Sequence, residues 1–338
     1  MQTATGPHTI AAGNTEAHEA PGRDRLLRRA AVWHLDGDLE AAEAAYLDLL
    51  TRNAKDAPTL NNLGLLRTQC GDGPGALAAY DAIGPTETLS PTALVNKANA
   101  HLLAEDVPAA IGLLQRAITL DPDSPAWAAL GQAHLLAGDV DAAETALRRA
   151  HELLPPRPDV LRSYAACLAH RGELGHAAEL LSTALDLDET DASTWRQFGL
   201  VLLGMQDFGS AASATRRAAD LEPDDVPTLR QLAVCLVALG RGPEAAGELD
   251  RALKLSQAPD LLVDRAVLHL ADGENQEAIA LLTEGLPQDT TGRARLHLGY
   301  AHLAAGDVPA AVEHLTAAAE LTGEVAAEAA SVLRQVTE

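Results

Sequence analysis

One stretch, from Trp127 to Pro155, decides the fold, and it reads WAALGQAHLLAGDVDAAETALRRAHELLP. Apolar residues recur every three or four positions on both sides of the pair Gly138-Asp139, which is the spacing of two amphipathic helices. Gly tolerates the left-handed backbone that ends a helix, and Asp readily starts the next one. Pro155 stops the second helix. The stretch therefore predicts two helices joined by a tight turn.

The same phrase returns nine times along the chain of 338 residues. Its copies begin, in steps of 33 or 34 residues, at Arg23, Ala57, Pro91, Ser124, Pro158, Ala192, Val226, Pro259 and Gly292. One helix pair is too thin to bury its own apolar face, so neighbouring pairs must stack. A fixed period of this length predicts an all-α solenoid and argues against a single globular core.

Numbering each copy from its first residue, as place 1, shows how its two helices meet. Places 4 and 11 hold large residues, while place 8 is small and is filled by Ala98, Gly131, Ala165, Gly199, Ala233, Ala266 and Gly299. The second helix answers with Ala at place 20 of every copy, from Ala42 to Ala311. Small residues on both sides allow the helix axes to approach near the lower end of about 8–10 Å.

These residues resemble the tetratricopeptide repeat family. The fourth copy carries Trp127, Leu130 and Gly131 as that motif requires, and the sixth carries Trp195 at the same place. The third copy departs from the motif, because Glu105 stands where the turn Gly belongs. The resemblance covers residues 23–323 and implies a right-handed superhelical solenoid of nine repeats.

The two ends of the chain are expected to differ from the repeats. Residues 1–22 mix Thr, Gly, His, Ala and Glu, which predicts a disordered tail without a signal-peptide pattern. Residues 324–338 place Val325, Ala329 and Val332 on one face, which predicts a helix that caps the ninth repeat. No stretch is apolar enough to span a bilayer, so we expect a cytoplasmic protein. The first repeat has no such cap, and a homodimer through a terminal repeat is an alternative.

Composition narrows the kinds of partner. A formal net charge of -23 argues against nucleic acid, since phosphate binding needs a basic face and no repeat forms one. Only 3% of the residues are aromatic, which suits thin layers of Ala and Leu better than a large globular core. We therefore expect protein or peptide partners and no membrane.

No pattern for catalysis, a cofactor or a metal stands out. The chain has no Gly-rich phosphate loop, nucleophile elbow or His-Glu-x-x-His motif, so we expect no enzyme activity and no cofactor. Cys167 and Cys235 occupy one place in their repeats, which predicts buried structural residues. His recurs at place 11, at His101, His134, His269 and His302, where we expect a ring packed between helices and no metal site.

The resemblance implies that first helices line a concave groove, with places 2, 5, 6, 9, 12 and 13 facing it. The candidate partner-binding residues at these places are Asn61, Asn62, Asn96, Asn99, Gln132, Arg162, Arg196, Gln197, Arg230, Gln231, His297 and Tyr300. The amides at place 6 resemble the asparagine ladder of O-linked N-acetylglucosamine transferase, which holds a peptide backbone, although Ala129 interrupts the series. An amide suits that task because it both donates and accepts hydrogen bonds.

Arg162, Arg196 and Arg230 fill place 5 of three consecutive repeats. Helices packed about 10 Å apart would space these residues to meet an acidic residue at every third position of an extended ligand. The alternative is that they pair with Asp159, Glu189 or other acids of the chain. The lysine and asparagine pattern of the carboxylate clamp in chaperone adaptors does not occur around Asn62.

Apolar residues would line the floor of the same groove. Place 9 holds Leu65, Leu200, Val234, Val267 and Tyr300, and place 12 holds Leu102, Leu135, Leu203, Leu270 and Leu303. A partner is therefore expected to bring apolar anchors, as an extended peptide or as an amphipathic helix. The sequence predicts a non-catalytic scaffold or adaptor. An accessory subunit of an enzyme and a peptide-sensing regulator are the alternatives.

Overall fold

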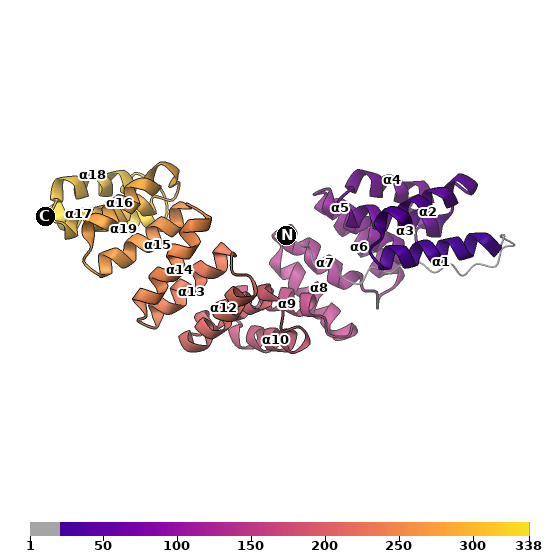
Figure 1. Cartoon of the computed structure of the whole chain (residues 1–338), viewed down its shortest axis with the longest axis horizontal. Coiled ribbons are helices and arrows are strands. Elements are labelled where there is room, and N and C mark those ends of the chain that lie inside the picture. The colour runs from indigo at the N-terminus through magenta and orange to yellow at the C-terminus, as the bar shows by residue number, and fades with distance from the viewer. Residues whose placement is uncertain (1–20, 338) are drawn as a thin grey trace. The chain divides into compact units, whose positions relative to one another are not determined.

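The computed structural model describes residues 21–337 of the chain (Figure 1). This part folds into 19 α-helices and two short 3-10 helices, and no strand occurs in it. The helices divide into two compact units at Leu187 and Asp188. The expectation of an all-α repeat solenoid is confirmed.

Unit 1 contains five helix pairs, each made of a first and a second helix that pack against each other. The first helices are α1 (Pro21–Leu35), α3 (Ala57–Gln69), α5 (Pro91–Leu103), α7 (Ala126–Leu136) and α9 (Pro158–His170). The second helices are α2 (Leu39–Arg52), α4 (Gly73–Ile83), α6 (Val107–Leu120), α8 (Val140–Leu153) and α10 (Leu174–Leu187). The 3-10 turn η1 (Thr86–Thr88) precedes α5.

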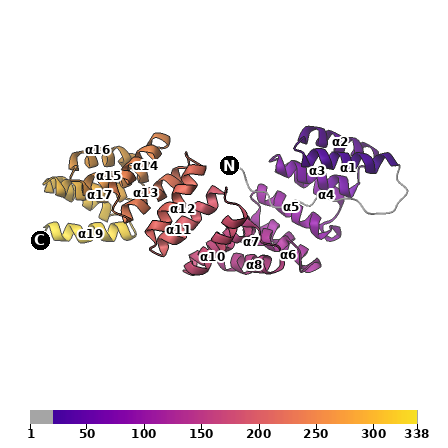
Figure 2. The ribbon, with the colours of Figure 1, turned by 60° about the horizontal axis from the view of Figure 1, so that its bottom comes forward.

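Unit 2 contains four further pairs and a lone last helix (Figure 2). Its first helices are α11 (Ala192–Gly204), α13 (Val226–Ala238), α15 (Pro259–Ala271) and α17 (Arg293–Ala304). Its second helices are α12 (Phe208–Leu221), α14 (Gly242–Leu255), α16 (Asn275–Gly285) and α18 (Val308–Ala319). The 3-10 turn η2 (Leu286–Gln288) follows α16, and α19 (Glu324–Thr337) ends the unit.

Close helix packing depends on the small residues at place 8. A Cβ atom added to Gly131 would lie 2.4 Å from Cγ of Leu147 on α8, so no side chain fits between α7 and α8 at this point. Tyr80 of α4 fills the same position opposite Gly64. Two Trp side chains at place 4 hold the loops between pairs by hydrogen bonds. Nε1 of Trp127 donates to the Pro122 carbonyl and Nε1 of Trp195 donates to the Glu189 carbonyl, both at 2.8 Å.

The turn inside each pair passes through the left-handed region at place 15. Gly fills seven of these nine turns, while Glu105 with φ of 60° and Gln206 with φ of 65° fill the other two. Asp at the following place then caps the second helix in six pairs: its side chain accepts a backbone N–H in α2, α4, α6, α8, α12 and α18. The turn chemistry therefore fixes where each second helix begins.

At the C-terminal end, α19 packs along α18 and contacts α17. Ala326 and Ala329 are buried there, and Val325, Val332 and Leu333 pack against Leu296, Leu315 and Ala318. The apolar side of the ninth pair is covered in this way. The predicted tail, residues 1–22, lies outside the described residues except for Pro21 and Gly22. These two belong to α1, because Pro is well suited to the first position of a helix.

Within residues 21–337, every helix is too short or too polar to traverse a lipid bilayer.

Candidate functional site

We call the side of unit 2 formed by α11, α13, α15 and α17 the first-helix face. Place 9 of each first helix lies four positions after place 5 and three after place 6, so its side chain lies beside both. Polar contacts join the successive helices: α13 contacts α11 through Gln231 and α15 through Arg230, and α17 contacts α15 through Arg293. The four helices therefore present one continuous surface.

Two arginines and two aspartates form a closed network on this face. Nε of Arg230 on α13 donates to Asp264 on α15 at 2.5 Å, and Nη1 lies 3.4 Å from Asp260. Arg293 on α17 donates to both aspartates at 2.9 Å. The hydrogen bond to Asp264 raises the pKa of the Arg230 guanidinium above its ordinary value. The network carries no net charge, because its two cations and two anions balance.

Arg196 and Gln231 connect α11 to the helices that follow it. Nε of Arg196 lies 3.9 Å from Asp225, a long contact at the surface. Nε2 of Gln231 donates to the backbone carbonyl of Arg196 at 2.8 Å and to Oγ1 of Thr215 at 3.1 Å. Gln231 was predicted to hold a ligand, but its amide nitrogen bonds within the chain.

The three arginines of the predicted row lie in different units, and two of them form ion pairs within the chain. Arg162 lies on α9 of unit 1 and has an interaction of its own, while Arg196 and Arg230 lie in unit 2. The alternative of internal pairing holds for Arg196 and Arg230, with acids other than Asp159 and Glu189. The physical reason is proximity, since Asp264 on the next first helix already accepts a hydrogen bond from the Arg230 guanidinium.

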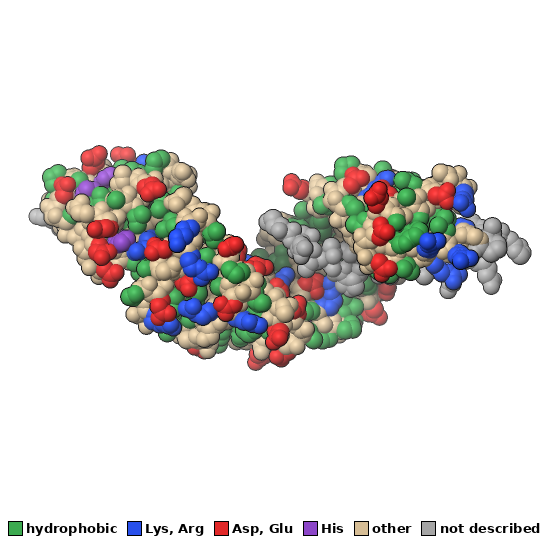
Figure 3. All heavy atoms as spheres, in the orientation of Figure 1, with side chains coloured by type: hydrophobic (Ala, Val, Ile, Leu, Met, Phe, Trp, Pro, Cys, Tyr) green, Lys and Arg blue, Asp and Glu red, His purple; other side chains and the backbone are tan. Residues whose placement is uncertain are grey.

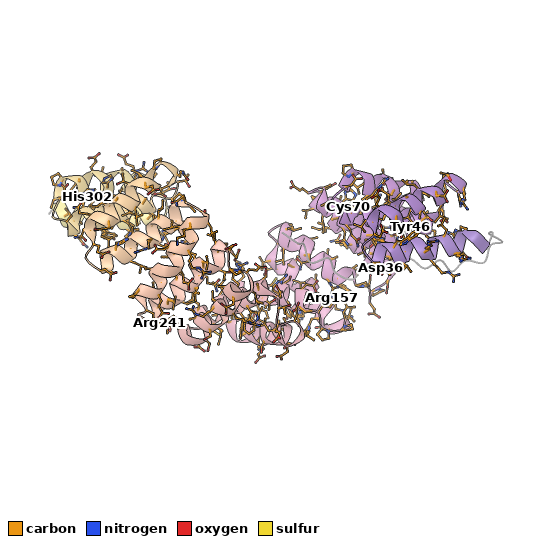
Figure 4. The ribbon with its side chains drawn as sticks, in the orientation of Figure 1. Asp36, Tyr46, Cys70, Arg157, Arg241 and His302 are labelled. Carbon is orange, nitrogen blue, oxygen red and sulfur yellow. The ribbon has the colours of Figure 1, made fainter. Side chains whose placement is uncertain are left out.

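The asparagines predicted to face a ligand are buried in unit 1. Asn61 and Asn62 on α3 and Asn96 on α5 are buried. Nδ2 of Asn96 donates to Oδ1 of Asn61 at 3.2 Å, and Nδ2 of Asn61 donates to Oδ1 of Asn62 at 3.4 Å. Burial raises the pKa of Tyr46 (labelled in Figure 4) to about 12, and a hydrogen bond with Asn62 reduces this effect. The expectation that these three amides are open to a peptide is wrong, because their side chains are buried.

The remaining candidate amides lie at partly exposed positions. Nε2 of Gln132 on α7 donates to Oγ of Ser163 on α9 at 2.5 Å, which again joins two repeats. Asn99 on α5 and Gln197 on α11 are half-buried, and Gln197 has an interaction of its own. Amides at places 5, 6 and 9 therefore mostly connect neighbouring first helices.

Tyr300 links α17 to the last helix, and His297 lies beside it. The Tyr300 hydroxyl donates to Oε1 of Glu328 on α19 at 2.6 Å, and the two rings lie 5.8 Å apart. Burial and the nearby Arg293 lower the pKa of His297, so the ring is neutral near pH 7. Burial and Glu328 raise the pKa of Tyr300 to about 12. Both side chains are partly exposed and already have neighbours within unit 2.

An apolar row crosses the first-helix face at place 9. Leu200 on α11, Val234 on α13 and Val267 on α15 expose 55%, 44% and 37% of their surface. Tyr300 continues the row on α17, and the row lies three or four residues after the polar groups at places 5 and 6. In unit 1 the equivalent Leu65 is only 1% exposed. The exposed row is confined to unit 2, and apolar side chains among charged ones are visible on its surface in Figure 3.

The histidines at place 11 have partners that were not predicted. Each ring faces the acid that precedes the second helix of its pair: His101 with Asp106 at 3.2 Å, His134 with Asp139 at 3.9 Å, His269 with Glu274 at 2.5 Å, and His302 (labelled in Figure 4) with Asp307 at 3.6 Å. The signal was present in the sequence as an acid five positions after each His. These contacts tie the turn to the end of the first helix.

Cys167 and Cys235 are buried, as predicted for structural residues. Burial raises the pKa of the Cys167 thiol to about 11, which keeps it protonated. Cys70, in the turn after α3, is exposed. Across residues 21–337, no three side chains of His, Cys, Asp or Glu gather in a way that could bind a metal ion.

Comparison with known families gives two matches, both described as tetratricopeptide repeat. One model matches residues 101–159 and 202–261, and the other matches residues 71–125, 236–293 and 263–326. Together they cover more than half of the chain. Among curated proteins no significant match was found.

Solved structures of the same architecture are also similar. A chain of the APC/C hetero-tetramer Cut9-Hcn1 matches with a TM-score of 0.58 and 18% identity over 82% of this chain and 55% of that one. PilF of Pseudomonas aeruginosa matches with a TM-score of 0.53 and 20% identity, over 62% of this chain and 98% of that one. This chain thus spans little more than half the length of the Cut9-Hcn1 chain. At these identities the likeness shows the fold alone.

Proposed function

Because the chain belongs to the tetratricopeptide repeat family, we propose that it is a non-catalytic scaffold whose first-helix face in unit 2 binds a segment of a partner protein. Members of this family bind protein or peptide partners. The observation that carries the proposal is the exposed apolar row of Leu200, Val234 and Val267. Aligned apolar side chains on adjacent helices favour a partner that covers them.

The spacing of the row defines what can bind it. Successive first helices lie roughly 10 Å apart, so the row offers one apolar contact about every 10 Å. An extended segment, rising about 3.3 Å per residue, would meet it with every third side chain. An α-helix, rising about 1.5 Å per residue, would meet it with every seventh. Both forms present their anchors on one side, and the spacing of anchors distinguishes them.

Apolar anchors are favoured over acidic ones by the charges beside the row. An acidic ligand would have to displace Asp264 or Asp260 from Arg230, which has both carboxylates within 3.4 Å. The net charge of -23 also repels acidic segments at long range. We therefore propose a partner segment that is apolar on one side and neutral or basic elsewhere.

Selection from a random peptide library displayed on phage tests the proposal, with the full chain immobilised as bait. Val234→Asp should lower the affinity of the selected peptides for the chain roughly tenfold or more, because burying a Val side chain contributes about 1.5–3 kcal/mol. Leu255→Asp is the matched control: Leu255 is 48% exposed but lies at the end of the second helix α14. Peptides that bind the Val234→Asp variant as well as the wild type would refute the assignment of this face.

A further inference from the structure

A second surface, on α1, stands out because it is open where its counterparts are covered. Arg25, Arg29 and Val32 occupy places 3, 7 and 10, and all three are exposed, Val32 by 53%. In the eight later repeats the residues at place 3 are buried: Thr59, Ala93, Ala126, Val160, Thr194, Thr228, Leu261 and Ala294. Those at place 10 are buried as well: Leu66, Ala100, Ala133, Cys167, Val201, Cys235, Leu268 and Ala301.

The cover in those repeats comes from the second helix of the repeat before. In unit 1, α4 packs on α5, and in unit 2, α14 packs on α15. On α1, by contrast, Arg25, Arg29 and Val32 are exposed, and among the described residues no helix precedes α1. Figure 3 shows basic side chains over the region of α1. The exposed side of α1 is therefore the same surface that binds a helix elsewhere in this chain.

A cation at place 7 follows a rule inside the chain. Nζ of Lys97 on α5 lies 2.7 Å from Asp81 on α4, and Nε of Arg265 on α15 lies 2.8 Å from Asp250 on α14. Both acids occupy place 25 of the preceding repeat. On α5 and α15, the cation at place 7 thus pairs with an acid of the second helix that packs on that first helix.

Arg29 is the third cation at place 7. Within the described residues it forms no ion pair, and its guanidinium stacks on the Trp33 ring at 4.5 Å from the ring centre. Arg25 and Arg28 extend the basic character along the same helix. By analogy with Lys97 and Arg265, a helix that packs on α1 would offer a carboxylate to form an ion pair with Arg29.

We propose that the open side of α1 binds an amphipathic helix of a partner protein, with an Asp or Glu opposite Arg29 and small apolar residues over Val32. A second copy related by two-fold symmetry fits poorly, because its own Arg25, Arg28 and Arg29 would face these three. This surface is distinct from the first-helix face of unit 2, so the two proposals stand or fall separately.

A synthetic copy of α14, residues 242–255, serves as the probe, because in the chain this helix brings Asp250 to Arg265. A staple between its exposed positions 247 and 251 holds it helical, since a free peptide of this length is only marginally so. Titrated into the isotope-labelled full chain, it should shift the amide resonances of α1. Arg29→Asp should weaken binding about tenfold, and a peptide with Asp250→Arg should restore it.

Arg149→Glu on α8 is the matched control, since Arg149 is an exposed arginine in another repeat, and it should leave the affinity unchanged. Two results would overturn the proposal. One is the absence of resonance shifts in α1, or an affinity that changes neither with Arg29→Asp in the chain nor with Asp250→Arg in the peptide. The other is a homodimer in sedimentation that Arg29→Asp dissociates, which would assign this surface to a second copy.

Discussion

At the scale of the residue, place 15 shows how one backbone angle recurs through the chain. All nine turns adopt a positive φ there, at Gly37, Gly71, Glu105, Gly138, Gly172, Gln206, Gly240, Gly273 and Gly306. For a residue with a Cβ atom this conformation costs about 1–2 kcal/mol. The sequence flagged Glu105 as a departure from the motif, but it did not single out Gln206.

Gln206→Gly is expected to stabilise the folded chain by about 1 kcal/mol, because it removes the strain of the left-handed backbone. The gain is smaller than the full strain, since Gly loses more conformational entropy on folding than Gln does. The midpoint of urea unfolding, followed by circular dichroism, measures the change. Gly240→Ala is the reverse control: a Cβ there meets open space, so only the strain at φ of 72° should act, and it should destabilise. A lower midpoint for Gln206→Gly would contradict this account.

At the scale of the element, the helix pair depends on how closely its axes approach. Place 8 is small throughout, and at Gly131 a methyl group would press on the branch point of Leu147. The spacing of Ala and Gly in the sequence predicted this close approach. The partner that fills each gap, Leu147 in one pair and Tyr80 in another, depends on side-chain rotamers that a pattern does not contain.

Gly131→Ala should destabilise unit 1 by about 1–3 kcal/mol, since the extra methyl forces α7 and α8 apart. Gly112→Ala in α6 is the control, because Gly112 is exposed in mid-helix with nothing within 4 Å of an added Cβ. The control should gain about 0.5–1 kcal/mol from helix propensity. Thermal and urea unfolding report both values, and equal effects at the two sites would show that packing is not the cause.

At the scale of the whole molecule, buried and half-buried histidines in both units link stability to pH. Burial lowers the pKa of His34 in unit 1, and it lowers those of His297 and His314 in unit 2, where Arg293 and His302 add to the effect. Each folded pKa lies below the ordinary value of 6.5, so the unfolded chain binds protons first as the pH falls. These rings therefore stabilise the fold above about pH 6.5 and lose that contribution below it.

The urea midpoint is accordingly expected to be lower at pH 5.5 than at pH 7.5. His297→Gln should reduce the pH dependence of unit 2, because Gln does not titrate. Burial raises the pKa of Asp289, but several hydrogen bonds together outweigh it and leave this pKa below its ordinary value; hydrogen bonds also lower the pKa of Asp207. Both carboxylates add a further loss of stability only below their ordinary value of 3.8. A midpoint that rises between pH 7.5 and 5.5 would show that other groups dominate.

The surroundings of the candidate binding residues were harder to predict than the fold. The amides Asn61, Asn62 and Asn96 looked like ligands for a peptide, yet they are buried against one another. Of the apolar residues that the sequence placed in a groove at place 9, Leu200, Val234 and Val267 are well exposed, while Leu65 is buried. Exposure depends on how much a neighbouring repeat covers, and identical places differ in that respect. The division into tail, repeats and cap, the superhelix and the cytoplasmic location stay predictions.

Helix, turn and pairing could be deduced from the chain alone, because they follow from contacts three, four or a few residues apart, which recur with the period. The partners of side chains between repeats could not. Arg230 meets Asp264 and Asn61 meets Asn96 across 34 and 35 residues, and those meetings depend on the register of stacked helices. The open side of α1 became visible in the same way, since burial at one place can be judged only against the helix that covers it.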